Sequence, residues 1–357
     1  MWPRGYTPPF FSLIAIFCLP LQHLGVPCIY IENRKLTMKV SVLVPVYGVE
    51  RYIAQCATTL MEQTYKDVEY IFVDDCTPDA SVERLQEVLD SYPERQAQVR
   101  VIGHDQNKGL AGARLTALNA ATGDAVIIVD SDDYVAPAAI ERLVAEMERT
   151  GADVVDGGYG MVSNGITTER FMPLHRSEKA YLRTILCQNV EPNRIWGRLI
   201  KKSLFDDHGI IFHQGIDYSE DFTVLPLLLL HAKRAWVDEC LYFYRNDNPE
   251  SYTNNITVKN AVSFLKAQQL VGTAFKQSNQ WRTYATAAQI GWVNVWRFAR
   301  RFGVDGALVD EHFHLLPTHL IMRCLAAMMR SRVVPFKVAN FVYKGMRRIY
   351  LNFAASN

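Results

Sequence analysis

The chain has 357 residues, of which 49% are hydrophobic and 21% charged, so it can bury a substantial core. This composition excludes a disordered, collagen-like or low-complexity protein. The 38 Lys and Arg residues almost balance the 37 Asp and Glu residues, but residues 312–357 contain seven basic side chains and no acidic one. An acidic body is therefore followed by a basic C-terminal region.

The hydrophobic pattern from residue 40 onward alternates between short apolar runs and helical periods. Strands are predicted at residues 40–46, 68–73, 99–102, 125–129 and 153–156. Helices are predicted between them at residues 50–63, 80–89, 109–120 and 137–149. Successive strand–helix units with short connections predict a parallel sheet with helices on both faces, in which ligands lie beyond the carboxyl ends of the strands.

The alternation ends near residue 157, where a glycine-rich segment, residues 157–160, interrupts it. The later predicted elements are helices at residues 177–187, 222–231, 258–276 and 281–301 and a strand at residues 240–244, and the basic tail contains two amphipathic stretches, residues 318–329 and 335–353. We expect three parts: an N-terminal extension over residues 1–37, an α/β domain over residues 38–255 and a helical, basic region over residues 256–357.

The N-terminal extension is uncharged over residues 5–31 and includes an apolar stretch at residues 10–19. Three interpretations are open: an upstream extension of the reading frame with Met38 as the start, a membrane anchor, or a cleaved signal peptide. The seven cysteines are scattered and form no C-x-x-C pair, which favours reduced thiols packed as small hydrophobic residues.

Polar side chains follow several of the predicted strands. Tyr47 follows the first strand, Asp74 and Asp75 end the second, and the run DSDD at residues 130–133 follows the fourth. Each acidic motif alone is equally compatible with a turn or a helix cap. Carboxylates gathered at one edge of a sheet repel one another unless a cation lies among them, and their oxygen atoms suit Mg²⁺ or Mn²⁺. Such an ion would bridge the pyrophosphate of a nucleotide.

Several longer motifs occur in order along the chain: VSVLVPVYGVERYI, QTYKDVEYIFVDDCTPD, NKGLAGARLTALNAATGDAVIIVDSDDYV, IWGRLIKKSLF, YSEDF and YFYRNDNPESYT. On these motifs the chain resembles the inverting family 2 glycosyltransferases, nucleotide-sugar-dependent enzymes with a GT-A-type fold. The resemblance extends from Val40 to about Thr253. It implies an α/β, Rossmann-like nucleotide-binding sheet with helices on both faces plus a helical C-terminal region, and it makes residues 38–255 the catalytic domain.

The resemblance also implies roles for individual residues. Six would surround a nucleotide-sugar donor, expected to be a UDP-sugar: Pro45 and Tyr47 at the base, Asp75 hydrogen-bonded to the base, Arg114 near the phosphates, Asp132 at the ribose and Arg245 near the diphosphate or the acceptor. Asp133 would bind Mn²⁺ or Mg²⁺, and Asp130 begins the D-x-D motif; the assignment within DSDD is open by one residue. Asp221 would be the general base, with Glu220 and Trp196 on the acceptor side.

The chemistry of an inverting transfer agrees with these residue types. One carboxylate must take a proton from the attacking hydroxyl, while a metal ion assists the leaving nucleoside diphosphate. Asp221 begins an apolar helix, and the helix dipole favours an ionised carboxylate there. The structural alternatives are a helix cap for Glu220 and Asp221 and a core position for Trp196.

The resemblance predicts transfer to a glycan or lipid-linked saccharide in the synthesis of cell-surface polysaccharide. The basic C-terminal region is amphipathic, which predicts a cytoplasmic protein bound peripherally at the inner face of the cell membrane, with no nucleic acid as partner. Two alternatives stay open. A nucleotidyltransferase should carry a glycine-rich basic loop after the first strand, where VPVYGVERY has one glycine and no lysine. A non-catalytic nucleotide-binding relative should have lost the acids that are present here.

Overall fold

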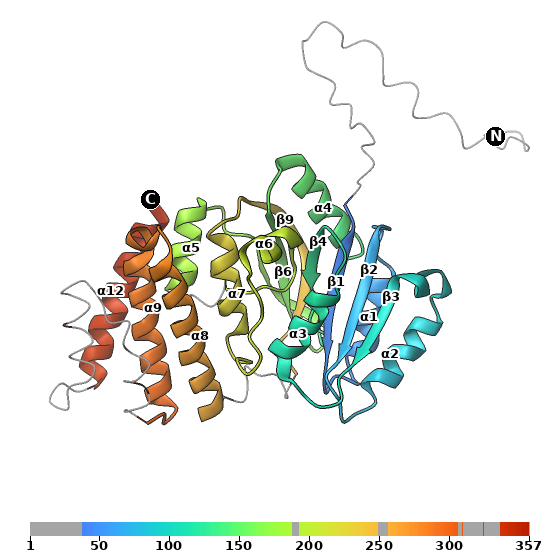
Figure 1. Ribbon diagram of the computed structural model, residues 1–357, viewed down its shortest axis with the longest axis horizontal. Coiled ribbons are helices and arrows are strands. Elements are labelled where there is room, and N and C mark those ends of the chain that lie inside the picture. Colours follow the sequence, from blue (N-terminus) through green and yellow to red (C-terminus); the bar gives the residue numbers. More distant parts are fainter. Residues whose placement is uncertain are drawn as a thin grey trace, which may run out of the picture. The chain divides into compact units, whose positions relative to one another are not determined.

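A mixed sheet of nine strands organises the computed structural model, which describes residues 38–187, 193–248, 256–305 and 336–356 together with Val309 and Cys324 (Figure 1). The strand order is β3-β2-β1-β4-β8-β6-β9-β5, with β7 paired to β6. Leu36–Asn357 form one compact unit, and the division of this unit at residue 255 stays a prediction. The predicted N-terminal extension lies outside the described residues.

The first four strands form the parallel half of the sheet, as predicted: β1 (Val40–Val46), β2 (Val68–Asp74), β3 (Val99–Gly103) and β4 (Ala125–Ile128). Strand β1 is buried along its whole length, because helices cover both faces. Its valines pack against α1 (Ile53–Met61), α2 (Ser81–Asp90) and α4 (Ala139–Thr150), whereas Leu43 packs on the side of α3 (Gly109–Ala120). The short 3₁₀ helix η1 (Pro93–Gln98) precedes β3.

The second half of the sheet departs from the parallel arrangement. Its strands are β5 (Tyr134–Val135), β6 (Val154–Ser163), β7 (Ile166–Phe171), β8 (Arg198–Lys201) and β9 (Arg234–Arg245). Strand β8 lies antiparallel between β4 and β6, and β9 returns parallel to β6. Consecutive strand–helix units predict only the parallel pairs, so the sequence pattern could not indicate this reversal.

The glycine-rich segment at residues 157–160 lies inside β6, where we expected a break. A Cβ atom on Gly158 would come 2.7 Å from the carbonyl oxygen of Glu239, and one on Gly160 would come 2.8 Å from Thr167 Cγ2. The absence of side chains therefore lets the neighbouring strands approach closely. A strand built on glycine carries no hydrophobic alternation, which explains why the pattern missed it.

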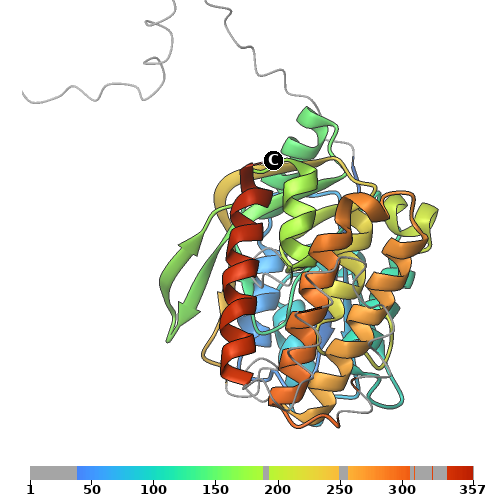
Figure 2. The same cartoon turned by 90° about the vertical axis from the view of Figure 1, so that its left-hand side faces the viewer.

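On the α3 side of the sheet lie α5 (Glu178–Leu186), α6 (Lys202–His208) and α7 (Glu220–Leu229). Helix α8 (Val258–Gln277) packs on α7, α9 (Trp281–Arg301) packs on α8 and α5, and α12 (Phe336–Ser356) packs on α5 (Figure 2). Helix α8 begins with a capping box between Thr257 and Asn260. The buried Tyr343 of α12 donates its hydroxyl hydrogen to the carbonyl oxygen of Ile290 at 3.3 Å. None of the described helices has both the length and the hydropathy of a membrane span.

Candidate active site

The carboxyl ends of β1 and β2 lie side by side, as the parallel arrangement predicts. The backbone N–H of Asp75 donates to the carbonyl oxygen of Val46 at 3.0 Å, which joins the two strand ends. Pro45 is buried within β1, and Tyr47 directly beyond the strand is 49% exposed. A half-exposed aromatic ring at this edge is accessible to a planar ligand.

Asp75 is almost completely buried, and its carboxylate binds the segment that leads into α3. Oδ1 accepts the backbone N–H of Lys108 at 2.7 Å, and Oδ2 accepts the N–H of Gly109 at 2.8 Å. The Nδ1 atom of His104 lies 2.7 Å from Oδ1. Asp75, which directly follows β2, therefore caps the N-terminus of α3. The helix dipole favours an anion at that end of the helix. Its predicted role at the base of a nucleotide stays a prediction.

A second carboxylate, that of Asp217, binds the same end of α3. Its Oδ1 accepts the N–H of Ala111 at 3.2 Å. A Cβ atom on Gly109 would overlap this carboxylate, and Gly109 has a φ of +81°, so the position requires glycine on both counts. Sequence analysis did not single out Asp217, because a lone acid in a loop carries no recognisable spacing.

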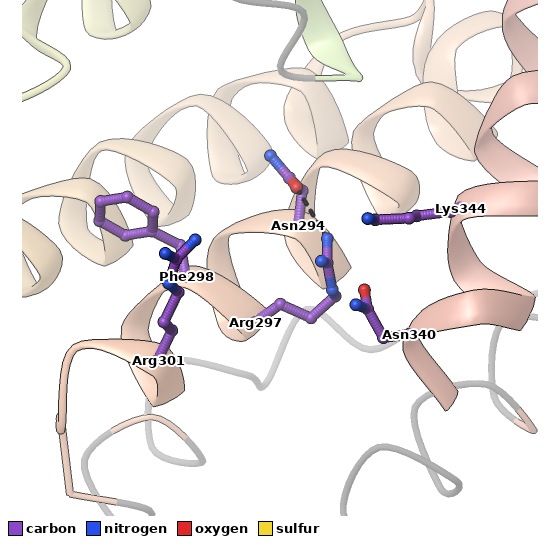
Figure 3. Close-up of a pocket in the computed structure, with 6 residues that line it drawn as sticks. All are labelled: Asn294, Arg297, Phe298, Arg301, Asn340 and Lys344. Atoms are coloured by element: carbon purple, nitrogen blue, oxygen red, sulfur yellow. Dashed lines mark hydrogen bonds between the residues drawn. The ribbon is translucent and has the colours of Figure 1, made fainter. Parts of the chain in front are cut away.

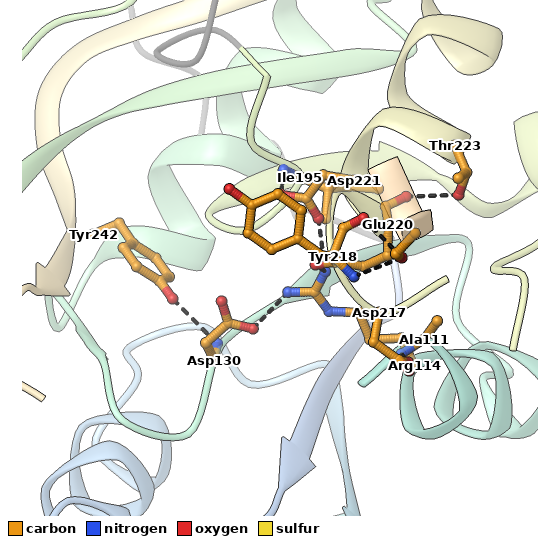
Figure 4. Close-up of polar contacts among 11 residues, drawn as sticks. Ala111, Arg114, Asp130, Ile195, Asp217, Tyr218, Glu220, Asp221, Thr223 and Tyr242 are labelled. Atoms are coloured by element: carbon orange, nitrogen blue, oxygen red, sulfur yellow. Dashed lines mark hydrogen bonds and ion pairs between the residues drawn. The ribbon is translucent and has the colours of Figure 1, made fainter. Parts of the chain in front are cut away.

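Arg114 lies at the centre of the candidate active site (Figure 4). Its side chain is 1% exposed and binds three carboxylates. Nη2 lies 2.7 Å from Asp130 Oδ1, and Nη1 lies 2.8 Å from Glu220 Oε1 and 2.6 Å from Asp221 Oδ1. One guanidinium on α3 thus connects the acid after β4 with the two acids that begin α7. The cluster carries more negative than positive charge.

The entry to α7 places the two acids. Ser219 adopts a left-handed backbone conformation with a φ of 69°, which costs a residue with a side chain about 1 kcal/mol. Glu220 and Asp221 follow in the first turn of α7 and contact Arg114 on another helix. Asp221 Oδ2 also accepts the N–H of Ile195 at 3.3 Å. These contacts join separate elements, which a simple helix cap would not do.

Burial controls the ionisation of this cluster. It raises the pKa of Asp221, an effect that Arg114 opposes and Asp130 increases. Burial and the neighbouring Asp221 raise the pKa of Glu220 well above its ordinary value. Burial would lower the pKa of Arg114, but the three carboxylates outweigh it and raise that pKa, so the guanidinium stays charged. A carboxylate with a raised pKa is a stronger proton acceptor near neutral pH.

The DSDD turn is held by residues of β9 and of the segment that follows it. Asp133 Oδ2 accepts the hydroxyl hydrogen of Tyr242 at 2.6 Å, and Oδ1 accepts the backbone N–H of Arg245 at 2.7 Å. The Tyr242 hydroxyl oxygen accepts the N–H of Asp130 at 3.1 Å. Asp132 Oδ2 accepts from Asn248 Nδ2 at 2.9 Å. Sequence analysis named neither Tyr242 nor Asn248, although the motif YFYRNDNPESYT contains both.

The three carboxylates of the DSDD turn lie close enough to affect one another's ionisation, and a divalent cation among them stays a prediction. Burial and Asp130 raise the pKa of Asp132 to about 6, and burial, Asp132 and Asp130 raise that of Asp133 well above its ordinary value. A cation beside them would remove this mutual repulsion. Within the described residues no group of three or more His, Cys, Asp or Glu residues is arranged to hold a metal ion. Mg²⁺ is commonly bound by one or two carboxylates together with phosphates and water.

Arg245 connects the turn to α1. Its Nε donates to the carbonyl oxygen of Asp132 at 3.0 Å, its Nη2 donates to Gln55 Oε1 at 2.6 Å, and its guanidinium lies 4.8 Å from the centroid of the Tyr52 ring. Arg245 therefore lies beside the acids of the DSDD turn. Whether it contacts a diphosphate stays a prediction.

Trp196 lies in an aromatic cluster over β9. Its ring stacks on Tyr242 with centroids 4.4 Å apart and on Tyr244 at 5.3 Å, and it meets Tyr159 edge-on at 5.1 Å. The guanidinium of Arg194 lies 4.8 Å from the Trp196 ring centroid. These contacts give Trp196 a packing role beside the Asp221 site, and its contact with an acceptor stays a prediction.

In open α/β sheets ligands bind beyond the carboxyl ends of the strands, and Asp130 and its partner Arg114 lie at that edge. Residues 41–210 match the model of glycosyl transferase family 2. Residues 41–210 are therefore a glycosyl transferase family 2 domain, which agrees with the family inferred from the motifs.

Known relatives agree with this assignment. The uncharacterized glycosyltransferase EpsJ of Bacillus subtilis is 35% identical over 223 residues, which cover 60% of this chain and 62% of the relative. TarS of Staphylococcus aureus, a poly(ribitol-phosphate) beta-N-acetylglucosaminyltransferase, is 27% identical over 212 residues, 58% of this chain and 35% of the relative. The chain thus spans less than two thirds of either protein.

The fold has a solved counterpart. The crystal structure of S. aureus TarS 1-349 in complex with UDP-GlcNAc matches with a TM-score of 0.62 at 21% identity, over 89% of this chain and 88% of that chain. This similarity confirms the expected GT-A-type fold with helices around the sheet and a helical C-terminal region.

Proposed function

We propose that this protein is an inverting glycosyltransferase that moves a sugar from a UDP-sugar to a hydroxyl group of a cell-surface glycan or a lipid-linked saccharide. The observation that carries the proposal is the Arg114 cluster, which joins the acid after β4 to the two acids of α7. A donor-side acid and a candidate base are thereby fixed in one site. The relatives named above support a glycan as the acceptor.

In the proposed reaction Asp221 accepts the proton of the acceptor hydroxyl as its oxygen attacks the anomeric carbon. The new glycosidic bond forms on the face opposite the bond to the diphosphate, which breaks, and UDP leaves with that electron pair. Arg114 and the N–H of Ile195 hold the Asp221 carboxylate in place. The raised pKa of Asp221 makes it a better proton acceptor than an exposed aspartate would be.

The donor would lie at the carboxyl edge of β1, β2 and β4. Tyr47 would stack on the base, with Pro45 and Asp75 beside it and Asp132 at the ribose. Asp133 and its neighbours in the DSDD turn would hold Mn²⁺ or Mg²⁺. When bound, such an ion neutralises the charge that develops on the leaving diphosphate.

We also propose peripheral attachment to the inner face of the cell membrane through α12. Val338, Phe341 and Ile349 are spaced along this helix and are 49%, 80% and 72% exposed. Helix α12 carries four basic and no acidic side chains. Exposed apolar side chains on a basic helix are typical of segments that lie in an anionic membrane interface.

A panel of nucleotide sugars, screened for turnover with Mn²⁺, Mg²⁺ and EDTA, tests the activity. Asp221→Asn should lower transfer by about 10²–10⁴-fold, the usual contribution of a general base, and should leave UDP binding within about threefold by calorimetry. Asp206→Asn, which removes an exposed acid on α6, is the control. Wild-type turnover by Asp221→Asn would refute the base assignment. Absence of cation-dependent UDP binding by the wild type would instead favour a non-catalytic relative.

A further inference from the structure

A cavity lies in the helical region, between α9 and α12. It has a volume of about 490 Å³ and is lined by Asn294, Arg297, Phe298 and Arg301 of α9 with Asn340 and Lys344 of α12. Figure 3 shows Lys344 reaching from α12 toward Arg297, whose guanidinium lies between the two asparagines. None of these residues belongs to the Arg114 cluster or the DSDD turn, so this cavity is a separate site.

The charge around this cavity has one sign. Three of the six lining residues are cationic, two are amides and one is aromatic. Helices α8, α9 and α12 together carry eleven basic and no acidic side chains. The helices on both sides of the cavity therefore bring positive charge to it without supplying a carboxylate.

Arg297 shows the consequence of this arrangement. Burial lowers the pKa of its half-buried guanidinium, and Arg347 and Arg301 lower it further, although Tyr343 opposes them. The guanidinium is nevertheless held in place, because Nη1 donates to Asn294 Oδ1 at 3.2 Å and its plane lies 4.6 Å from the centroid of the Tyr343 ring. An anion in the cavity would stabilise the charge of an arginine that is already oriented.

Two buried polar atoms of the cavity residues have no hydrogen-bond partner among the described residues: Nε of Arg297 and Oδ1 of Asn340. Buried polar groups are normally paired, so such atoms call for a ligand group or water. An N–H donor beside cations suits a phosphate oxygen, and an amide oxygen suits a hydroxyl hydrogen. Together they describe a ligand that carries both groups.

We propose that this cavity binds an organic phosphate whose carbon part bears a hydroxyl group. The phosphate would lie among Arg297, Arg301 and Lys344, the hydroxyl would donate to Asn340, and the carbon part would pack on Phe298. The volume is within the range of small-molecule sites, about 300–1,000 Å³. A soluble polyol phosphate and the glycerol phosphate headgroup of an anionic lipid share this chemistry.

The test compares two double variants of the full chain that lose the same charge. Arg301→Gln with Lys344→Gln alters the cavity, whereas Arg300→Gln with Lys337→Gln alters exposed positions of the same two helices outside it. All four side chains are exposed, so both variants should fold, which thermal unfolding checks. Calorimetry measures binding of sn-glycerol 3-phosphate, and sedimentation measures binding to phosphatidylcholine vesicles with and without phosphatidylglycerol.

We expect the control variant to bind glycerol phosphate within about twofold of the wild type. Because both variants lose one lysine of the basic helix α12, vesicle binding is compared between the two variants, and we expect the cavity variant to bind at least one probe tenfold or more weakly than the control variant. If the cavity variant alone loses affinity for glycerol phosphate, the ligand is soluble. If it loses affinity only for phosphatidylglycerol vesicles, the ligand is a lipid headgroup. Equal losses in the two variants, or no binding of either probe by the wild type, would overturn the proposal. If the protein transferred no sugar, the proposed function would be wrong but these binding results would still stand, because the cavity and the candidate active site share no residue.

Discussion

Replacement of Arg114 by methionine tests the charge balance of the active site directly. Methionine keeps an unbranched side chain and a good helix propensity but removes the positive charge. Asp130, Glu220 and Asp221 would then lose their shared partner at 2.6–2.8 Å. Removing one partner of a buried ion pair typically costs about 3–5 kcal/mol, and the loss here falls on three carboxylates.

The pH dependence of this loss has a definite sign. Arg114 lowers the pKa of Glu220 and of Asp221, so its removal raises both further above their values in the unfolded chain. The folded variant then binds more protons than the unfolded chain as the pH falls below those pKa values. Its stability deficit should therefore be largest at pH 7.5 and should shrink toward pH 5.

Urea unfolding followed by tryptophan fluorescence at both pH values measures the effect. Arg149→Met is the matched control, because Arg149 also forms an ion pair with a glutamate on a helix, Glu146 at 2.7 Å, but its side chain is 71% exposed. This control should leave the unfolding midpoint almost unchanged, since exposed pairs contribute little. A cost below about 1 kcal/mol for Arg114→Met at pH 7.5, or a deficit that does not shrink in acid, would contradict the charge balance described here.

Three further changes test neighbouring parts of the site. In EDTA, Asp132→Asn should stabilise the protein at pH 7.5 by up to about 2–3 kcal/mol, at 1.4 kcal/mol per pKa unit. The reason is that the pKa of about 6 in the folded protein makes wild-type stability fall as the pH rises from 4 to 6. Thermal melts should therefore show no gain from the substitution at pH 4. Tyr242→Phe leaves Asp133 Oδ2 without its donor and should lower urea stability by about 1–3 kcal/mol; an unchanged midpoint would exclude this role. Ser219→Gly relieves the left-handed conformation and should raise the melting temperature, whereas a lower value would show that the serine side chain contributes more than the backbone strain costs.

Much of the fold was predictable because burial leaves a periodic trace in the sequence. The apolar run of β1 and the helical spacing of α3 and α9 identified these elements almost to the residue. The reversal at β8 was not predictable, since four residues of strand do not reveal the direction of their partner.

Part of the candidate site was predictable from the order of strands and helices along the chain. The ends of parallel strands meet at one edge, so the positions of Tyr47, Asp75 and the DSDD turn followed from the order of elements. The partners of Arg114 did not follow, because Glu220 and Asp221 lie more than a hundred residues along the chain. Hydrogen-bond pairing across such separations depends on the path of the whole backbone.

The position of β9 has a consequence for how the site is assembled during synthesis. The DSDD turn leaves the ribosome well before Tyr242 and Arg245, the two residues of β9 that hold Asp133. The matched family domain ends at residue 210, so Asp221 also emerges after it. A nascent chain that ends at residue 210 would therefore carry Asp133 without its two hydrogen-bond donors and would lack the candidate base. Translation must proceed to residue 245 before these parts of the candidate active site can come together.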